Sequence, residues 1–293
     1  MFQPLLGPGV HRSIPYDQYN SHPAMRSTML KILLKGQPAD LKVALESPWK
    51  SDSDALLRGD VLHTMLLEPF LESQKFVYES TKLVGSKAAK KENNGCKEDW
   101  DQLKKLANDG LKKLVPYDIY SACIGMAESV RESQDWQRVE RFADKELTLI
   151  ADIDGVRVKV RLDAYFRGLI VDLKTTSGGL SEREIMNTIV EYEYPLSAAM
   201  YCAVADELGL PADCFRWIFI QSKPPHQWVV VDAEPELLKR GTMEFKKTLE
   251  IYRMAAETDI WPGYFGDRRK TGLPDWYKKR TYSWGQFDDS TEK

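Results

Sequence analysis

Strict alternation of apolar and basic residues marks 156–162 as a β-strand. Every second position is apolar and the positions between are basic, because Val156, Val158, Val160 and Leu162 alternate with Arg157, Lys159 and Arg161. Side chains two residues apart in a strand share a face, so the pattern is typical of a strand with one buried face. Residues 146–150 form a second predicted strand, and Asp154-Gly155 between the two is a strong hairpin signal.

A nearly continuous apolar run follows at 169–174, after a second turn at Arg167-Gly168. A strand that is apolar at almost every position is expected in the middle of a sheet, where both of its faces are buried. Two further strands are predicted at 215–221 and 228–232.

Helical spacing of apolar residues predicts helices before and after these strands. They cover residues 24–35, 51–67, about 99–113, 117–134, 182–208 and 235–257. The order is helices, a strand meander, a helix, two strands and a last helix. This order predicts an α/β or α+β fold, with a central mixed sheet flanked by helices and an N-terminal helical region.

The remaining segments are predicted to belong to a single domain that covers residues 1–293. Residues 1–23 are rich in Pro, Gly and Tyr and are expected to form an extended arm. Residues 83–99 are polar and rich in lysine, which predicts a flexible loop. Residues 265–293 form a tail that mixes aromatic with basic residues, among them Arg268, Arg269 and Lys270. The tail is either a solvated end or a segment that faces DNA.

Composition limits the class of protein. The net charge of −3 and the pI of about 5.9 do not suit a protein that simply coats nucleic acid. No apolar stretch approaches the length of a membrane span, and the N-terminus lacks a secretory signal, so a cytoplasmic protein is expected. The cysteines have no metal-site spacing and are expected to be free thiols. Nucleotide-binding glycine motifs and a nucleophilic serine motif are also missing, which argues against a small-molecule enzyme.

Candidate chemistry centres on Asp172-Leu173-Lys174 in the buried strand. Asp172 and Lys174 share one face of this strand, and the hairpin-like return of the chain brings Asp163 alongside them. Two carboxylates and an ammonium suit phosphodiester hydrolysis with one or two Mg²⁺ or Mn²⁺ ions. The tripeptide alone is equally typical of a structural ion pair. Residues 40–42 repeat it without a carboxylate-bearing strand upstream.

Two further residues are weaker candidates. His63 lies on a predicted helix, with Gly59 one turn earlier on the same face. A glycine there predicts close approach of the helix to a neighbouring element, with His63 directed at it. Imidazole is a plausible metal ligand, although a lone histidine is more often a packed or surface residue. Glu146 begins the strand meander and is either a further carboxylate near the metal or an exposed charge.

These residues, in their order and spacing, resemble the nuclease domain of RecE-type exonuclease (exonuclease VIII) and related phage exonucleases. These belong to the PD-(D/E)xK superfamily, with RecB-type nucleases and lambda exonuclease as relatives. The resemblance covers most of the chain, from about Tyr16 to Tyr264. Its motifs are Tyr16-Asp17-Gln18-Tyr19 with 25–30, Gly59 to His63 with Leu67-Glu68-Pro69, Arg161-Leu162-Asp163, Asp172-Leu173-Lys174-Thr175-Thr176 and Trp261-Pro262-Gly263-Tyr264.

The resemblance implies a restriction-endonuclease-like core and assigns roles within it. His63, Asp163, Asp172 and the Leu173 main-chain carbonyl are the implied metal ligands, and Lys174 is the implied catalytic lysine. The family carries Gln-x-x-x-Tyr on a following helix. Tyr201 matches the tyrosine, but Ser197 stands at the glutamine position. A serine is shorter and offers no amide, which puts the role of this helix in doubt.

The resemblance also implies an activity and partners. Enzymes of this family degrade one strand of linear duplex DNA from the 5′ end and leave a 3′ single-stranded tail for recombination. Relatives form trimeric or tetrameric rings and work with a RecT-type single-strand annealing protein. A pocket for a 5′-phosphate would need an arginine, and Arg26 and Arg161 are the candidates.

Two alternatives remain open from the sequence. One keeps the fold and changes the activity to a structure-specific or single-strand DNA nuclease. The other is a catalytically inactive DNA-binding or assembly module, which predicts a broken metal site. The presence of His63, Asp163, Asp172 and Lys174 argues against this second alternative.

Overall fold

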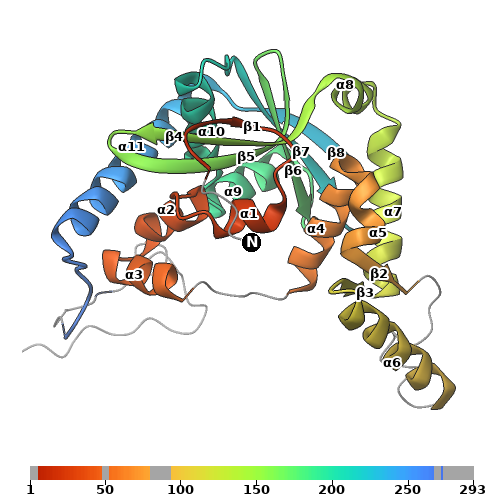
Figure 1. Ribbon diagram of the computed structural model, residues 1–293. Coiled ribbons are helices and arrows are strands. Elements are labelled where there is room, and N and C mark those ends of the chain that lie inside the picture. Colours follow the sequence, from red (N-terminus) through yellow and green to blue (C-terminus); the bar gives the residue numbers. More distant parts are fainter. Residues whose placement is uncertain (1–5, 48–52, 80–93, 267–271, 273–293) are drawn as a thin grey trace, which may run out of the picture. The chain divides into compact units, whose positions relative to one another are not determined.

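A six-stranded mixed sheet forms the centre of the fold (Figure 1). The computed structural model describes residues 6–47, 53–79, 94–266 and 272. In spatial order the strands are β1 (Gly9–His11), β4 (Asp144–Ile153), β5 (Val156–Phe166), β6 (Leu169–Thr176), β7 (Cys214–Gln221) and β8 (Trp228–Asp232). All neighbours are antiparallel except β6 and β7, which are parallel. The predicted fold class is therefore confirmed.

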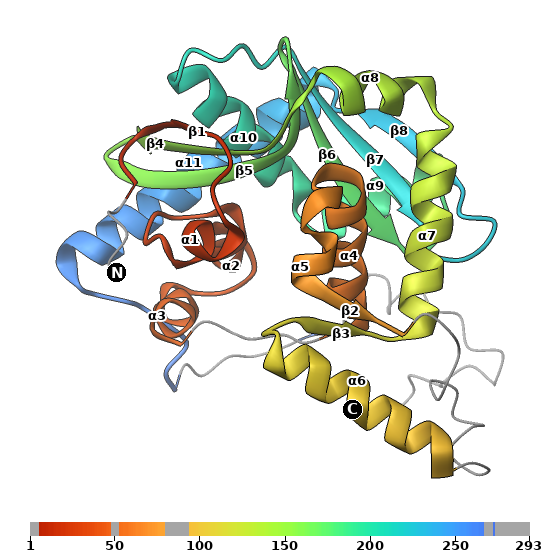
Figure 2. The same cartoon turned by 45° about the vertical axis from the view of Figure 1, so that its right-hand side comes forward.

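Helices cover both faces of this sheet (Figure 2). The helices α2 (Ser27–Lys35), α9 (Glu182–Glu191), α10 (Tyr194–Glu207) and α11 (Pro235–Thr258) supply residues to one apolar cluster. The helices α4 (Asp54–Leu67), α7 (Tyr117–Arg131) and α8 (Gln134–Phe142) supply residues to the other. The remaining elements are α1 (Tyr16–Ser21), α3 (Pro38–Glu46), η1 (Pro69–Leu71), α5 (Glu72–Lys75), β2 (Phe76–Tyr78), α6 (Asn94–Asp109) and β3 (Lys113–Val115).

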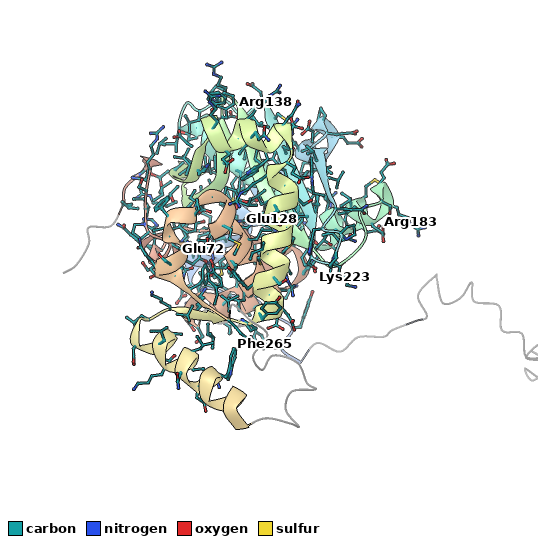
Figure 3. The ribbon with its side chains drawn as sticks, turned by 90° about the vertical axis from the view of Figure 1, so that its right-hand side faces the viewer. Glu72, Glu128, Arg138, Arg183, Lys223 and Phe265 are labelled. Atoms are coloured by element: carbon teal, nitrogen blue, oxygen red, sulfur yellow. The ribbon has the colours of Figure 1, made fainter. Side chains whose placement is uncertain are left out.

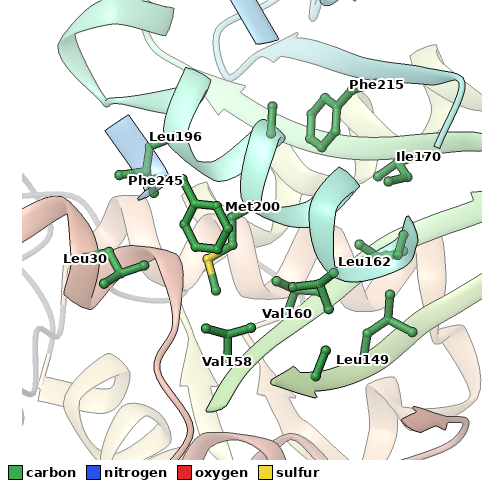
Figure 4. Close-up of a cluster of buried hydrophobic side chains, with 14 of the residues drawn as sticks. Leu30, Leu149, Val158, Val160, Leu162, Ile170, Leu196, Met200, Phe215 and Phe245 are labelled. Atoms are coloured by element: carbon green, nitrogen blue, oxygen red, sulfur yellow. The ribbon is translucent and has the colours of Figure 1, made fainter. Parts of the chain in front are cut away.

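The first cluster packs the alternating apolar residues of β5 against α10, α2 and α11 (Figure 4). Val158, Val160 and Leu162 are fully buried beneath Met200 of α10 and Phe245 of α11. Burial of each such side chain contributes about 1.5–3 kcal/mol. The period-two pattern seen in the sequence is thus the inner face of β5.

The second cluster lies on the opposite face, under α4 and α7. Val171 and Leu173 of β6 belong to it, whereas Ile170 belongs to the first cluster. Because successive residues of a strand alternate in direction, Asp172 falls on the same face as Ile170. Outside this layer, Glu128 of α7 and Arg138 of α8 are exposed (Figure 3).

The predicted hairpin between the first two long strands is confirmed. Strand β4 ends at Ile153 and β5 begins at Val156. The two turn residues, Asp154 and Gly155, have φ angles of 49° and 80°. Positive φ at both positions is what a two-residue type I′ turn requires, and Asp-Gly is suited to it.

The N-terminal segment differs from the expected extended arm. Within residues 6–23 the chain forms strand β1 and helix α1. Strand β1 adds to the edge of β4, with Gly9 opposite Ile150 and His11 opposite Thr148. The unpaired edge of β4 supplies the hydrogen-bonding groups for this strand, a long-range partner that composition does not reveal.

The long helix predicted at 182–208 is instead two helices, α9 and α10. They are separated at Tyr192 and Glu193, and Glu193 has a φ of 53°. A left-handed residue interrupts helical hydrogen bonding, and Pro195 then starts the second helix in the first-turn position where proline is tolerated.

The loop predicted at 83–99 is shorter than expected at its C-terminal end, because α6 begins at Asn94. Residues 83–93 lie outside the described residues. Several short elements were not predicted: α3, α8 and the small parallel sheet of β2 and β3. Helix α8 has a clear amphipathic pattern, with Trp136 and Val139 buried, which the prediction overlooked. Strands β2 and β3 have three residues each, too few to show a period, and α3 is only weakly amphipathic, so tertiary packing decides these elements.

The chain divides into two compact units, Met1–Pro262 and Gly263–Lys293. The described part of the second unit, residues 263–266 and 272, contains no helix or strand. Among the described residues, no helix combines the length and the apolar character that crossing a membrane demands.

Candidate active site

The candidate site lies where strands β5 and β6 separate. Their pairing runs over Phe166–Leu169, Tyr165–Ile170 and Ala164–Val171 and then stops. Asp163 and Asp172 are the next two residues, one on each strand. Beyond this fork β5 continues beside β4, and β6 continues beside β7. The fork brings both carboxylates close together, as predicted from the hairpin-like return between the two strands.

Asp163 takes over a hydrogen bond that the sheet gives up at the fork. Its Oδ2 accepts from the Leu173 backbone N–H at 2.6 Å. A buried backbone donor without a partner is costly, so the carboxylate stabilises the separated strands. The same contact fixes Asp163 next to the Leu173 carbonyl and its neighbours Asp172 and Lys174.

Lys174 and Asp172 form an ion pair on β6. Asp172 is almost fully buried, and the Lys174 side chain is 25% exposed. Burial lowers the pKa of the Lys174 ammonium, but the charges of Asp172 and Asp163 outweigh burial and raise it above its ordinary value. The lysine is therefore a fixed cation at the rim of the acidic group.

His63 reaches the fork from helix α4. Its Nε2 lies 3.2 Å from the Leu173 carbonyl oxygen, and its Nδ1 lies 3.6 Å from Asp163 Oδ1. The histidine expected to point at a neighbouring element thus points at the two candidate ligands. The reason given for Gly59 was wrong, because a Cβ at this position would meet no atom of the described residues within 4 Å. Gly59 therefore does not mediate close packing of α4.

Glu146 joins this group through an unusual backbone conformation. In the β4–β5 register, Lys145 pairs with Ala164 and Leu147 pairs with Leu162, which places Glu146 opposite Asp163. Glu146 has a φ of 50°, in the left-handed region that non-glycine residues rarely adopt inside a strand. Such a conformation persists only where the surroundings impose it, and it is frequent at functional sites.

Burial disfavours the charged form of the carboxylates in the acidic group. It raises the pKa of Asp163 to about 6; the charges of His63 and Lys174 act in the opposite direction, and those of Asp172 and Glu146 act in the same direction as burial. Several carboxylates in a dry site repel one another until a cation compensates them. The group is therefore suited to hold positive charge.

The donor set fits a divalent cation. Ligand atoms of His63, Glu146 and Asp163 lie within 4.8 Å of one another. Two further ligand candidates lie beside this group. Asp172 forms the ion pair with Lys174, and the Leu173 carbonyl oxygen lies 3.2 Å from His63 Nε2. Carboxylate and carbonyl oxygens are the ligands that Mg²⁺ and Mn²⁺ prefer, and one imidazole is compatible with them. The divalent-metal site expected from the sequence therefore has a suitable set of residues, with Glu146 more central than anticipated.

Arg161 is not placed to bind DNA. Its side chain is 8% exposed and forms an ion pair with Glu146, lies 3.8 Å from Glu68 Oε1, and donates to the Ile14 carbonyl at 2.8 Å. These contacts occupy the guanidinium and hold the Glu146 carboxylate in place. The other arginine candidate, Arg26, precedes α2, is partly exposed and donates to Asn20 Oδ1 at 2.7 Å.

The helix α10 places Tyr201 near the acidic group. Burial raises the pKa of Tyr201 well above its ordinary value, and the charges of Tyr19, Asp172 and Asp163 act in the same direction. Ser197, one turn earlier in the same helix, is partly exposed. Tyr201 is therefore close enough to Asp172 and Asp163 to be influenced by their charges.

Two other features lie apart from this group. Arg268, Arg269 and Lys270 lie outside the described residues. An open hollow of about 490 Å³ is lined by Ser129, Leu180, Pro225, Gln227, Trp228 and Val229. It contains none of the acidic residues, so the chemistry of the site is not built there.

Comparison with known families decides the classification. Residues 27–269 match the family described as "PDDEXK-like domain of unknown function (DUF3799)". This chain belongs to that PDDEXK-like family. The matched range includes His63, Glu146, Asp163, Asp172 and Lys174.

One solved structure supports the assignment of the fold. A crystal structure of a "putative exonuclease" from Eubacterium rectale is 13% identical, with a TM-score of 0.60, and the alignment covers 90% of this chain and 96% of that one. At this identity the similarity shows the fold alone. A phage-related exonuclease from Haemophilus somnus aligns over 61% of this chain and 93% of its own, at 16% identity and a TM-score of 0.31, too low to carry an argument. No curated protein sequence matches the chain.

Two residues that the sequence did not single out, Lys31 and Tyr194, lie at the rim of the site beside the predicted Lys174. Lys31 of α2 and Lys174 of β6 both lie over the ring of Tyr194, the first residue of α10. The three come from distant segments, and none has a local motif that announces the contact. The break of the helix at Glu193 is the event that places Tyr194 there.

Proposed function

We propose that this protein is a metal-dependent exonuclease that degrades duplex DNA from its ends, in the 5′-to-3′ direction. One observation carries the proposal: Asp163 and Asp172 meet at the fork between β5 and β6, with Lys174 paired to Asp172 at its rim. PDDEXK-like family membership supports a nuclease. The end preference and the polarity rest on the resemblance to RecE-type exonucleases.

The residues divide into two roles. Asp163, Asp172, Glu146, His63 and the Leu173 carbonyl would hold one or two Mg²⁺ or Mn²⁺ ions. A bound divalent ion supplies charge stabilisation at a phosphate and a more acidic water. Binding the ion would release the Asp163 carboxylate from mutual repulsion with its neighbours.

Lys174 would act on the substrate directly. Its ammonium can donate to a phosphate oxygen, where negative charge develops during hydrolysis, or orient the attacking water. Asp172 holds it within reach, and the Tyr194 ring lies beneath it at 5.2 Å from Nζ to the ring centroid. Positioning of this kind is the main contribution that a protein makes to phosphoryl chemistry.

The assembly is also proposed from the resemblance. The protein would act as a closed trimeric or tetrameric ring around duplex DNA, which suits an acidic chain because a ring needs no tight binding to stay on its substrate. It would pass the 3′ tail to a RecT-type annealing protein. Mass photometry of the purified protein, which gives the number of subunits, tests the ring. Co-purification with a RecT-type annealing protein tests the partner.

The decisive experiment is digestion of linear duplex DNA labelled separately at the 5′ and 3′ ends. Purified protein with Mg²⁺ or Mn²⁺ is compared with protein in EDTA and with the Lys174→Ala variant. Early release of the 5′ label, dependent on metal and lost in the variant, is the expected result. Early release of the 3′ label would reverse the polarity, and degradation of single strands alone would indicate a different nuclease. Intact DNA under all metal conditions would overturn the nuclease assignment.

A further inference from the structure

Two lysine ammonium groups share one aromatic ring beside the acidic group. Lys31 Nζ lies 5.1 Å from the centroid of the Tyr194 ring, and Lys174 Nζ lies 5.2 Å from it. Cations within about 6 Å of a ring centroid are attracted to the ring face. Lys31 comes from α2 and Lys174 from β6, so the ring connects two elements that are far apart in sequence.

The Tyr194 ring is held in place from the sheet side. It stacks on Trp217 at 6.4 Å between centroids and lies 6.3 Å from Phe219, both in β7. Tyr192 stacks on it at 5.7 Å. Trp217 and Phe219 are buried core residues, so the ring is a rigid support and not a mobile side chain.

Lys31 differs from the neighbouring lysines in lacking an acidic partner. Lys35, one turn later in α2, pairs with Glu193 at 3.4 Å, and Lys174 pairs with Asp172. Within the described part of the chain, no carboxylate lies within ion-pair distance of Lys31. Burial, and after it the charge of Lys174, lower the pKa of Lys31 to about 8, although the charges of Asp172 and Glu193 act in the opposite direction.

An unpaired cation in a half-buried position needs an anion to offset its desolvation. The anion must reach Lys31 beside the Tyr194 ring, whose centroid lies 5.1 Å from Lys31 Nζ and 5.2 Å from Lys174 Nζ. A phosphodiester meets this requirement, because it carries its charge on exposed oxygens and its neighbours along a strand supply further oxygens at regular spacing.

We propose that Lys31 binds a backbone phosphate of the strand being cut, adjacent to the phosphate that Lys174 contacts. The Tyr194 ring sets the spacing between the two ammonium groups, so that the strand is held in register with the acidic group. The inference rests on the proposed nuclease function and deepens it, because it assigns a strand-positioning residue that the sequence motifs do not contain.

Binding without cleavage tests the inference. The affinity of a fluorescently labelled duplex with a recessed end is measured by anisotropy over a salt series, with Ca²⁺ in place of Mg²⁺ to prevent cutting. Lys31→Gln is compared with Lys35→Gln, the same substitution one turn along α2 at an exposed lysine that already has a carboxylate partner. Lys31→Arg tests rescue by a second cation.

Lys31→Gln is expected to weaken binding about tenfold and to reduce the slope of log Kd against log salt by about one. In Mg²⁺ its KM should rise more than its kcat falls. Lys31→Arg should restore most of the affinity, and Lys35→Gln should resemble the wild type. The reduced salt slope is the sign of a lost phosphate contact, which a packing defect does not produce.

Two outcomes would count against the inference, and they differ. If the wild type cuts DNA while Lys31→Gln keeps the wild-type salt slope, or loses only thermal stability, Lys31 is a packing residue and the inference fails alone. If the wild type neither binds nor cuts DNA, the proposed function fails and the inference fails with it.

Discussion

Glu146 lies directly opposite Asp163 in the β4–β5 register, yet its left-handed backbone, with a φ of 50°, interrupts the regular ladder there. The conformation costs on the order of 1–3 kcal/mol. Arg161 forms an ion pair with the displaced carboxylate and keeps it beside Asp163 and His63. The distortion thus converts a strand residue into a third carboxylate of the candidate metal group.

Replacement of Glu146 by glutamine should weaken metal binding. The variant keeps the size of the side chain and removes the charge that adjoins Asp163 and His63. We expect the Mg²⁺ concentration for half-maximal cleavage to rise about tenfold, in the range that loss of one supporting group near a metal produces. Titration of cleavage against Mg²⁺ measures it.

Glu68→Gln is the control for this variant, because Glu68 also faces Arg161, at 3.8 Å, but does not belong to the metal group. An equal shift in both variants would show that only the ion-pair network matters. It would remove Glu146 from the set of ligands.

Asp163→Asn should stabilise the metal-free protein while abolishing cleavage. The amide oxygen still accepts from Leu173 N–H, but the buried charge is gone. Burial raises the pKa of Asp163 to about 6, above its ordinary value near 3.8. Between these values the unfolded chain has lost the proton and the folded protein has kept it. Stability of the wild type is therefore lost as pH rises from about 4 to about 6.

The variant lacks this loss. In EDTA, its Tm should exceed that of the wild type above pH 6, and the difference should shrink towards pH 4. A wild-type Tm equal to or above that of the variant at neutral pH would show that the charged form of Asp163 is not destabilised by burial.

Gly59→Ala should stabilise helix α4. A Cβ at Gly59 meets open space, and alanine is preferred over glycine inside a helix by about 1 kcal/mol. Urea unfolding should show a gain of up to that size, with unchanged cleavage. Gly125→Ala in α7 is the matched control, because its Cβ would lie 2.5 Å from His226 Cδ2 and should destabilise the protein. A lower free energy of unfolding in Gly59→Ala would contradict the open space found around Gly59.

Lys159→Met should loosen helix α1. The buried ammonium donates to the carbonyl oxygens of Tyr19, Asn20 and His22 at 2.6, 3.2 and 2.6 Å. Carbonyl groups left without donors cost about 1–3 kcal/mol. Chemical denaturation should show a loss of this order. Arg157→Met, two residues earlier on an exposed position of the same strand, should change stability little; equal losses would refute a specific role for Lys159.

The sequence predicts the centre of the fold because local patterns determine it. Alternation of apolar residues defines β5, and Asp154-Gly155 defines the turn before it. Once β5 and β6 are placed as returning strands, Asp163 and Asp172 must come near each other. The ion pair of Asp172 with Lys174, one open interpretation of the tripeptide, exists in the structure alongside the candidate catalytic arrangement.

The parts that the sequence did not predict depend on distant contacts. Strand β1 exists because β4 offers an unpaired edge. Glu146 has a positive φ beside the fork, where Arg161 pairs with its carboxylate, and glutamate has no intrinsic preference for this conformation. Arg161 itself, a candidate DNA contact by residue type, is buried against Glu146. Residue type alone cannot tell an arginine that meets solvent from one that a carboxylate already holds.

The short pairing between β5 and β6 also determines how the two halves of the sheet are connected. The strands β1, β4 and β5 on one side and β6, β7 and β8 on the other are joined across only three residue pairs. The two halves of the sheet therefore share only a short region of direct strand pairing, at the closed end of the fork. Directly beyond the last paired residues, the hydrogen bond from Leu173 N–H to Asp163 Oδ2 still joins the two strands. A cation bound at Asp163 would draw on the carboxylate that accepts this hydrogen bond, so it would act directly on the contact that spans the fork.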